Sequence, residues 1–216
     1  MYNLNVNNRI LLRDRMIYIF GDSHAESSFA GLRLKHENRH RYSFTMHRVG
    51  RDNSIPNFQE HINSRFNSFV FCFGEIDCRC HIGKQVLLGR DKVEICETLV
   101  SNYIRTILGS ITSFRKIIVC AVPPPTNKEK HESRHGPIDH DLPFVGSDQE
   151  RLENTQILNS ILKTECEKNG IVFLDYTGEY SDETGCLIWE KSDKNVHIKY
   201  NQYIIRQLYK ILNYPM

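Results

Sequence analysis

The chain has 216 residues, of which 40% are hydrophobic and 25% charged, with a formal net charge of +2. This composition is ordinary for a globular protein, and the length suits a single domain over residues 1–216. The small net charge gives no reason to expect nucleic acid as a partner. No apolar run reaches the ~18 residues of a membrane span, and the start lacks the apolar stretch of a secretory signal. We therefore expect a cytoplasmic protein without a membrane span.

The sequence contains seven cysteines, an odd number, and several of them lie inside apolar runs. This pattern favours reduced, buried thiols over disulfides. A metal site is the alternative, because Cys78, Cys80 and His81 lie close together. Their spacing is too compressed for the usual zinc motifs and no second pair exists, so we expect no bound metal.

Short apolar runs, typical of buried strands, recur along the chain. We expect strands at 15–20, 68–73, 116–122 and 171–174, and a weaker fifth at 42–49. Helical patterns fall between them, at 25–34, 91–111, 148–169 and 200–211, and the third helix begins with a capping-box pattern at Ser147 and Glu150. This alternation predicts a three-layer α/β/α sandwich with a mainly parallel sheet of five strands. In such sheets the functional site lies beyond the carboxyl ends of the strands.

Candidate catalytic residues follow the first predicted strand. Gly21, Asp22, Ser23 and His24 stand between that strand and a helix-like stretch. A serine at such a turn has its own N–H among the free donors of a helix start, which suits a nucleophile whose intermediate carries an oxyanion. The alternative is that Asp22 or Ser23 simply caps the helix.

Three further groups carry polar chemistry. Asp193 and His197 precede the last predicted helix, and with an early serine they supply the parts of a triad. Glycine and carboxylates directly after the second apolar run indicate a strand end that faces a cleft, or else a solvated loop. Gly50 either lets the backbone approach a ligand closely or is a plain turn glycine. The group after the second run consists of Gly74, Glu75, Asp77 and Arg79. We expect these four residues, together with Asp22, His24 and Gly50, to bind the oxyanion or the substrate.

In order and spacing these groups resemble the sequence blocks of the SGNH (GDSL-type) hydrolases over residues 16–200. Gly21-Asp22-Ser23 matches the first block, Gly50 is placed like the glycine of the second, 74–77 like the third, and Asp193 and His197 like the final Asp-x-x-His. The resemblance implies a flavodoxin-like sheet, and ester hydrolysis or acyl transfer through an acyl-serine. It assigns Ser23 as nucleophile, His197 as base, Asp193 as the orienting acid, and the N–H groups of Ser23 and Gly50 as oxyanion donors. No metal or organic cofactor is implied.

The chain departs from the family pattern at two places. Ile76 replaces an asparagine that donates to the oxyanion, and losing such a donor can cost ~2.7–4 kcal/mol. Arg79 is the nearest substitute, unless it pairs with Glu75 or Asp77 and only holds the loop. Asp193 lies four residues before His197 instead of three, so Glu75, Asp77 or a backbone carbonyl are alternative partners of the histidine.

The stretch 74–79 also resembles a subgroup found near glycan-building enzymes, which implies a carbohydrate ester as substrate. We therefore expect a serine esterase that removes O-acetyl or similar small acyl groups from a carbohydrate. One alternative is an O-acetyltransferase with the same residues, because water and alcohols attack the same acyl-enzyme. The other is a non-catalytic glycan-binding module. The segment 123–144 shows no evident element, and we expect a mobile substrate loop there or, alternatively, a metal cluster of His131, His135 and His140.

Overall fold

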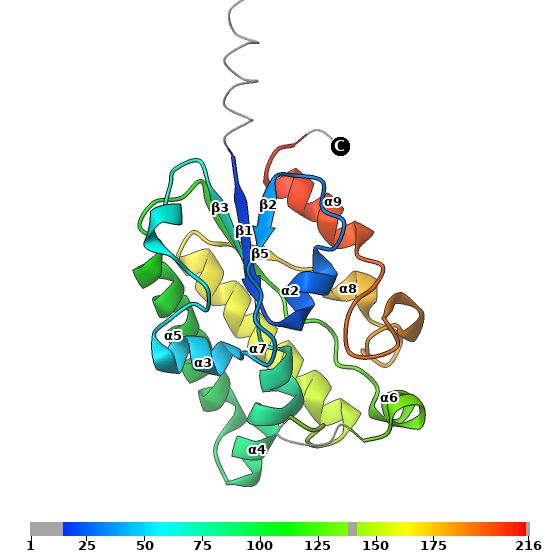
Figure 1. Cartoon of the computed structure of the whole chain (residues 1–216). Coiled ribbons are helices and arrows are strands. Elements are labelled where there is room, and N and C mark those ends of the chain that lie inside the picture. Colours follow the sequence, from blue (N-terminus) through cyan, green and yellow to red (C-terminus); the bar gives the residue numbers. More distant parts are fainter. Residues whose placement is uncertain (1–14, 138–141, 215–216) are drawn as a thin grey trace, which may run out of the picture.

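The computed structural model describes residues 15–137 and 142–214. These residues form one parallel sheet with helices packed around it (Figure 1). The strand order is β2-β1-β3-β4-β5. β1 pairs with both β2 and β3, so the direction of the strand order reverses at β1. In sheets of this kind, ligands bind in the crevice at the carboxyl ends of the strands where the order reverses, here between β1 and β3. The strands are β1 (Ile17–Gly21), β2 (His36–Asn38), β3 (Ser68–Cys72), β4 (Lys116–Cys120) and β5 (Val172–Leu174).

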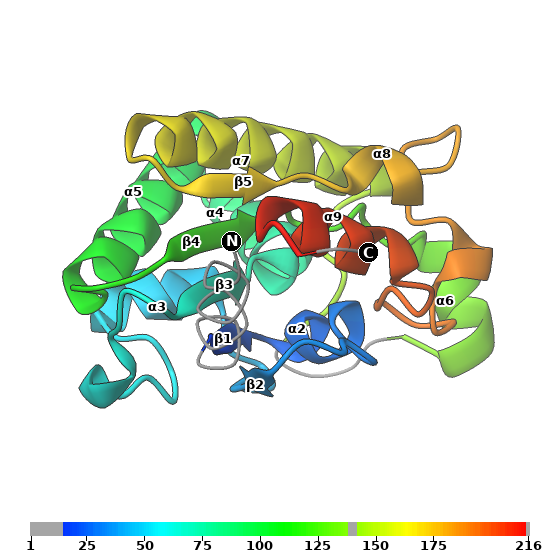
Figure 2. The same ribbon diagram turned by 90° about the horizontal axis from the view of Figure 1, so that it is seen from above.

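Helices cover both faces of this sheet (Figure 2). α3, α5 and α7 lie on one face, and α2, α8 and α9 on the other. The α-helices are α2 (Ser23–Ser28), α3 (Met46–Asp52), α4 (Ile82–Leu87), α5 (Lys92–Ser110), α6 (Lys128–His135), α7 (Asp148–Lys168), α8 (Thr177–Tyr180) and α9 (Gln202–Ile211). The short turns are η1 (Glu60–Ile62) and η3 (Trp189–Lys191), and a π-helical segment, η2 (Asp77–His81), leads into α4.

Alternate side chains of the central strands feed two separate apolar cores. In β3, Phe69 and Phe71 pack with α3, α5 and α7, whereas Val70 and Cys72 pack with α2, α8 and α9. All five residues of β3 are buried, as expected for a strand covered on both faces. The predicted three-layer α/β/α sandwich with five parallel strands is therefore confirmed.

The prediction of a strand at 42–49 is wrong, because this segment turns and enters helix α3. Thr45 caps the helix, and its hydroxyl accepts a hydrogen bond from the Arg48 N–H at 3.1 Å. The fifth strand is instead β2, which pairs with β1. It has three polar residues on the sheet edge, so it lacks the apolar pattern that marks the other strands.

Two further helical predictions need correction. The helix expected at 25–34 is α2, which begins and ends earlier, at Ser23 and Ser28. Segment 123–144 contains α6, which begins at the Asn127 cap. α6 carries mostly charged and imidazole side chains, so it shows no apolar stripe in the sequence. The predicted capping box of α7 is confirmed, because Ser147 and Glu150 each accept a hydrogen bond from the other's backbone N–H.

Several expectations concern what the chain lacks. None of the described helices combines the length and apolarity that crossing a bilayer requires. All seven cysteines lie in the described residues, where they are buried and form no disulfide. The single domain over 1–216 and the cytoplasmic location stay predictions.

Gly50 lies inside α3, at the contact between α3 and α5. A Cβ atom at this position would lie 2.7 Å from Asn102 Cβ and 3.2 Å from the Asn102 carbonyl carbon. Its role is therefore to let two helices approach closely. Within a helix the N–H is bonded to the carbonyl four residues earlier, so Gly50 is not an oxyanion donor and this expectation is wrong.

We expect Gly50→Ala to lower the free energy of unfolding by about 1–3 kcal/mol, because overpacking at a helix contact forces the backbones apart. Gly109→Ala in α5 is the matched control: nothing lies within 4 Å of the added methyl group. It should be neutral or stabilising by up to about 1 kcal/mol. Urea unfolding of both variants measures the difference, and equal stabilities would contradict the packing role of Gly50.

Candidate active site

Ser23 stands at the first position of α2, directly after the central strand β1. The Asp22 carboxylate caps this helix by accepting a hydrogen bond from the His24 N–H at 2.8 Å. Gly21 permits the turn, since a Cβ there would lie 2.3 Å from the Cys72 carbonyl oxygen of β3. The serine is thereby placed at the carboxyl edge of the sheet, between β1 and β3, as the sequence predicts.

His197 and Asp193 complete a chain of hydrogen bonds with Ser23. The Ser23 hydroxyl lies 2.8 Å from His197 Nε2, and His197 Nδ1 lies 2.8 Å from Asp193 Oδ2. Although burial acts to raise the pKa of Asp193, the hydrogen bond and charge of His197 and two backbone N–H groups hold it below its usual value. Asp193 is therefore the carboxylate that pairs with the His197 imidazole.

The extra residue between Asp193 and His197 is absorbed by a compact loop. Lys194 adopts a left-handed backbone conformation with φ of +67°. The Asp193 N–H bonds to the His197 carbonyl at 2.9 Å, and an antiparallel bridge joins Ser192 to Ile198. The loop closes on itself, so the carboxylate returns to the imidazole in spite of the longer spacing.

His24 connects the two halves of the site. Its buried ring lies between the Asp22 carboxylate, 3.2 Å from Nδ1, and the Val196 carbonyl, 2.9 Å from Nε2. Its ring centroid is 4.7 Å from that of His197. Burial acts to lower the pKa of His24, but Asp22, Glu75 and the Val196 carbonyl outweigh it and raise the pKa to about 9. Both ring nitrogens face acceptors, so the imidazolium form suits this position.

The carboxylates of the third block have structural partners of their own. Glu75 Oε1 accepts from Arg79 Nε at 2.8 Å, and Arg79 and His24 hold the pKa of Glu75 below its usual value in spite of burial. Asp77 accepts from the Met46 and His47 N–H groups in the first turn of α3, at 2.8 and 3.3 Å. Neither carboxylate is therefore the partner of His197. Gly74 has φ of +121°, and a Cβ there would lie 2.6 Å from Val122 Cγ2, just after β4.

Arg79 braces a loop beside the groove. Its Nη1 donates to the Leu142 carbonyl at 2.5 Å, and its own carbonyl accepts from the Val145 N–H at 3.0 Å. The guanidinium also lies over the Phe144 ring, 5.7 Å from its centroid. Of the two sequence alternatives, the loop-holding role fits these contacts.

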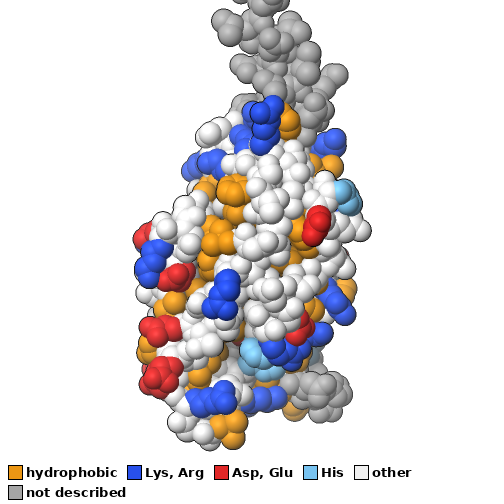
Figure 3. Space-filling model, turned by 90° about the vertical axis from the view of Figure 1, so that its left-hand side faces the viewer, with side chains coloured by type: hydrophobic (Ala, Val, Ile, Leu, Met, Phe, Trp, Pro, Cys, Tyr) orange, Lys and Arg blue, Asp and Glu red, His pale blue; other side chains and the backbone are white. Residues whose placement is uncertain are grey.

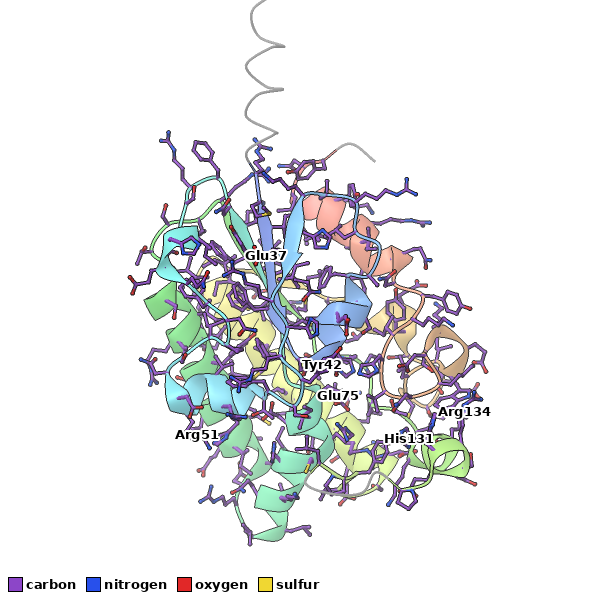
Figure 4. All side chains as sticks on the ribbon, in the orientation of Figure 1. Glu37, Tyr42, Arg51, Glu75, His131 and Arg134 are labelled. Carbon is purple, nitrogen blue, oxygen red and sulfur yellow. The ribbon has the colours of Figure 1, made fainter. Side chains whose placement is uncertain are left out.

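Ser23, Ile76, Arg79 and His197 line an open groove of about 970 Å³ at the strand ends. Sequence reasoning missed most of its other residues, since the segment that supplies many of them was expected to be a strand. Figure 4 shows Tyr42 and Glu75 at the strand ends, between Arg51 on α3 and His131 on α6. The added lining residues include Tyr42, Ser43, Thr45, His47, Arg48, Arg51, His81 and Asn195.

α6 supports the loop that carries His197. His131 Nε2 lies 2.8 Å from Asn195 Oδ1, and His135 Nε2 lies 2.5 Å from the Lys194 carbonyl. His131 and His135, two of the three histidines of this predicted loop, thus contact an amide and a backbone carbonyl. The third, His140, lies outside the described residues. Within 15–137 and 142–214, no three His, Cys, Asp or Glu side chains gather as a metal site, including the group at 78–81.

No protein-family model matches the chain, and no curated protein matches it by sequence. Solved structures do match. A lipolytic G-D-S-L family protein from Veillonella parvula shares 15% identity, over 92% of this chain and 97% of that one, with a TM-score of 0.52. A GDSL-like lipase from Bacteroides thetaiotaomicron shares 13% identity, over 93% of this chain and 88% of that one, with a TM-score of 0.54. The OSK domain of Drosophila Oskar shares 11% identity, over 91% of this chain and 88% of that one, with a TM-score of 0.57. The chain therefore has the fold of the GDSL-type (SGNH) hydrolases.

We expect His24→Gln to change how stability depends on pH. Because the folded state raises the His24 pKa from 6.5 to about 9, its contribution is complete below pH 6.5 and is lost as pH rises through 9. The shift corresponds to about 3 kcal/mol. Wild-type stability, measured by urea unfolding at pH 6, 7.5 and 9, should fall across this window, and the His24→Gln profile should be flatter. Parallel profiles would contradict a buried imidazolium.

Arg79→Met separates the loop-holding role from an oxyanion role. As a brace, its loss leaves Glu75 buried without its cation and lowers stability by about 3–5 kcal/mol. The double variant Glu75→Leu/Arg79→Met should recover part of this loss, because no unpaired charge remains. If instead Arg79→Met unfolds like the wild type while kcat and kcat/KM for an aryl acetate fall together about 10²–10³-fold, Arg79 is an oxyanion donor.

Proposed function

We propose that the chain is a serine esterase of the SGNH type that acts through an acyl-serine. The observation that supports this most is the continuous chain of hydrogen bonds from Ser23 through His197 to Asp193. In this reaction Ser23 Oγ attacks the acyl carbonyl while His197 Nε2 takes its proton. The same imidazole then donates that proton to the leaving alkoxide, and Asp193 stabilises the imidazolium.

The Ser23 N–H is one donor for the oxyanion in this proposal. It lies in the first turn of α2, where backbone N–H groups have no partner within the helix. Such a donor is already in place when negative charge develops on the carbonyl oxygen beside Ser23. The Ile76 side chain lines the groove where the family places an amide, so it offers shape there without a hydrogen bond.

We propose a carbohydrate that carries O-acetyl or similar small acyl groups as the substrate. The groove beside Ser23 is wide and is lined by hydroxyl, imidazole, guanidinium and amide groups of the kind that hydrogen-bond to sugar hydroxyls. Polar side chains outnumber apolar ones among the described lining residues, which supports a small acyl group over a long acyl chain. Transfer of the acyl group to a sugar hydroxyl, in place of water, uses the same residues.

Ser23→Ala and His197→Ala should each lower hydrolysis of a small aryl acetate by about 10⁴-fold, because they remove the nucleophile and its base. Asp193→Asn should lower it strongly as well, since the amide cannot stabilise the imidazolium. Ser27→Ala, on the same helix, is the matched control and should keep near-normal kcat. Release of acetate, with melting curves to confirm folding, measures each effect.

Retention of more than about a tenth of the rate by Ser23→Ala or His197→Ala would contradict the esterase proposal. A well-folded wild type that neither hydrolyses aryl acetates nor reacts with a serine-directed fluorophosphonate would favour the non-catalytic glycan-binding module. Formation of an acetylated product when a sugar acceptor is added would favour the transferase.

A further inference from the structure

The groove that contains Ser23 is lined by cationic and imidazole groups. In the described part of the chain no Asp or Glu side chain lines this groove. Figure 3 shows Arg, Lys and His side chains in the lower part of the face that carries α3, with Asp and Glu side chains beside them. The lining residues of this kind are Arg48, Arg51 and Arg79, together with His47, His81, His131, His135 and His197. A groove of this composition favours a negatively charged ligand.

The groove continues into a second cavity of about 1010 Å³ beside α3, α4 and α5. Three residues line both cavities: His47, Arg51 and His81. His47 and Arg51 are one turn apart on α3, and His81 ends the π-helical segment η2. The junction between the cavities is thus made by one guanidinium and two imidazoles, and we name these three residues the junction cluster.

The local charges leave this region positive. Arg51 donates from Nε to Asp52 Oδ1 at 2.7 Å and from Nη2 to Oδ2 at 3.3 Å. Arg48 approaches the same carboxylate at 3.9 Å, and its guanidinium lies over the Phe44 ring, 4.5 Å from the centroid. Two guanidinium groups therefore share one carboxylate.

The other charged groups at the junction do not reverse this balance. Burial and neighbouring cations lower the pKa values of His47 and His81, which therefore serve at neutral pH mainly as hydrogen-bonding imidazoles. Arg79 is already paired with Glu75. The second cavity is also lined by three carboxylates, Asp77, Asp91 and Glu94, and by Arg90. Asp77 accepts from backbone N–H groups of α3, and Asp91 caps α5 by accepting from the Glu94 N–H. The unshared positive charge lies on the Arg48 and Arg51 pair.

We propose that the junction cluster is a subsite for an anionic group, a carboxylate or a phosphate, carried by the acylated substrate. The anion binds to Arg51 with hydrogen bonds from His47 and His81, while the acyl ester lies at Ser23 in the same groove. Nε and one N–H of Nη2 of Arg51 already face Asp52, so the anion meets the other edge of the guanidinium, formed by Nη1 and the second N–H of Nη2. This edge still presents paired donors to carboxylate or phosphate oxygens. This inference rests on the proposed function only in taking Ser23 as the reacting group, and it narrows the substrate to acidic glycans.

Binding to the Ser23→Ala protein tests the subsite without turnover. The probes are an O-acetylated methyl hexuronoside, the same compound with its carboxylate converted to a carboxamide, and an O-acetylated methyl hexoside phosphate. Calorimetry should show at least about tenfold tighter binding of the acid than of the amide. The phosphate arm shows whether the subsite prefers carboxylate or phosphate. Raising the salt concentration should weaken binding of the acid and leave binding of the amide unchanged.

Adding Arg51→Gln should remove most of the preference for the acid. Arg206→Gln, an exposed change on α9 with the same loss of charge, should keep it. Three results would overturn the subsite. These are equal affinity for the acid and the amide, an equal loss of the preference for the acid in Arg51→Gln and Arg206→Gln, or no binding of any probe at millimolar concentration. Hydrolysis of a neutral aryl acetate by the wild type separately decides the esterase proposal, so the two failures are distinguishable.

Discussion

A single buried imidazole joins the beginning of the chain to its end. The His24 ring lies between the Asp22 carboxylate, next to Ser23, and the Val196 carbonyl, next to His197. The two residues of the candidate site that must touch are 174 positions apart in sequence, and ordering such segments costs conformational entropy. Because His24 contacts a neighbour of each, one side chain sets both positions. Its charge is balanced by Asp22 and Glu75, which explains why carboxylates are buried beneath the site.

α6 holds the same loop from its outer side. His131 and His135 contact Asn195 and the Lys194 carbonyl, so the loop is contacted both from within and from outside. α6 is in turn tied to α7, because the Asn127 amide that begins it donates to Asp148 at 2.7 Å. A site supported in this way keeps its geometry before a ligand arrives, which is what electrostatic stabilisation of a reacting group requires.

The sequence predicts those elements whose burial leaves a mark on composition. β3 is apolar throughout because both of its faces are covered, and the same reasoning finds β1, β4 and β5. β2 and α6 leave no such mark, since one is a polar edge strand and the other a polar surface helix. The sequence singles out Ser23, Asp193 and His197 because their motifs, each weak alone, stand in an order that resembles one family, and the structure brings the three side chains into one chain of hydrogen bonds.

The errors in the site follow from one misjudged element. Phe44, Met46 and Val49 are all buried, and their apolarity suggests a strand when the Thr45 cap is not recognised. With 42–49 taken as a strand, Gly50 falls in a turn where its N–H is free. As part of α3 it is a packing contact, and the same helix brings His47 and Arg51 to the groove. Only the three-dimensional arrangement shows which of these residues line the groove.

The left-handed Lys194 has a consequence for how proteins of this fold are recognised. One residue with positive φ lets a five-residue loop present the same acid and base as the four-residue Asp-x-x-His pattern. In this chain the hydrogen bond between carboxylate and imidazole therefore forms in spite of the longer spacing. A linear motif with fixed spacing excludes chains of this kind, whereas a description by the three interatomic contacts includes them. Divergent members of this architecture are better sought by the geometry of their polar atoms than by the count of residues between them.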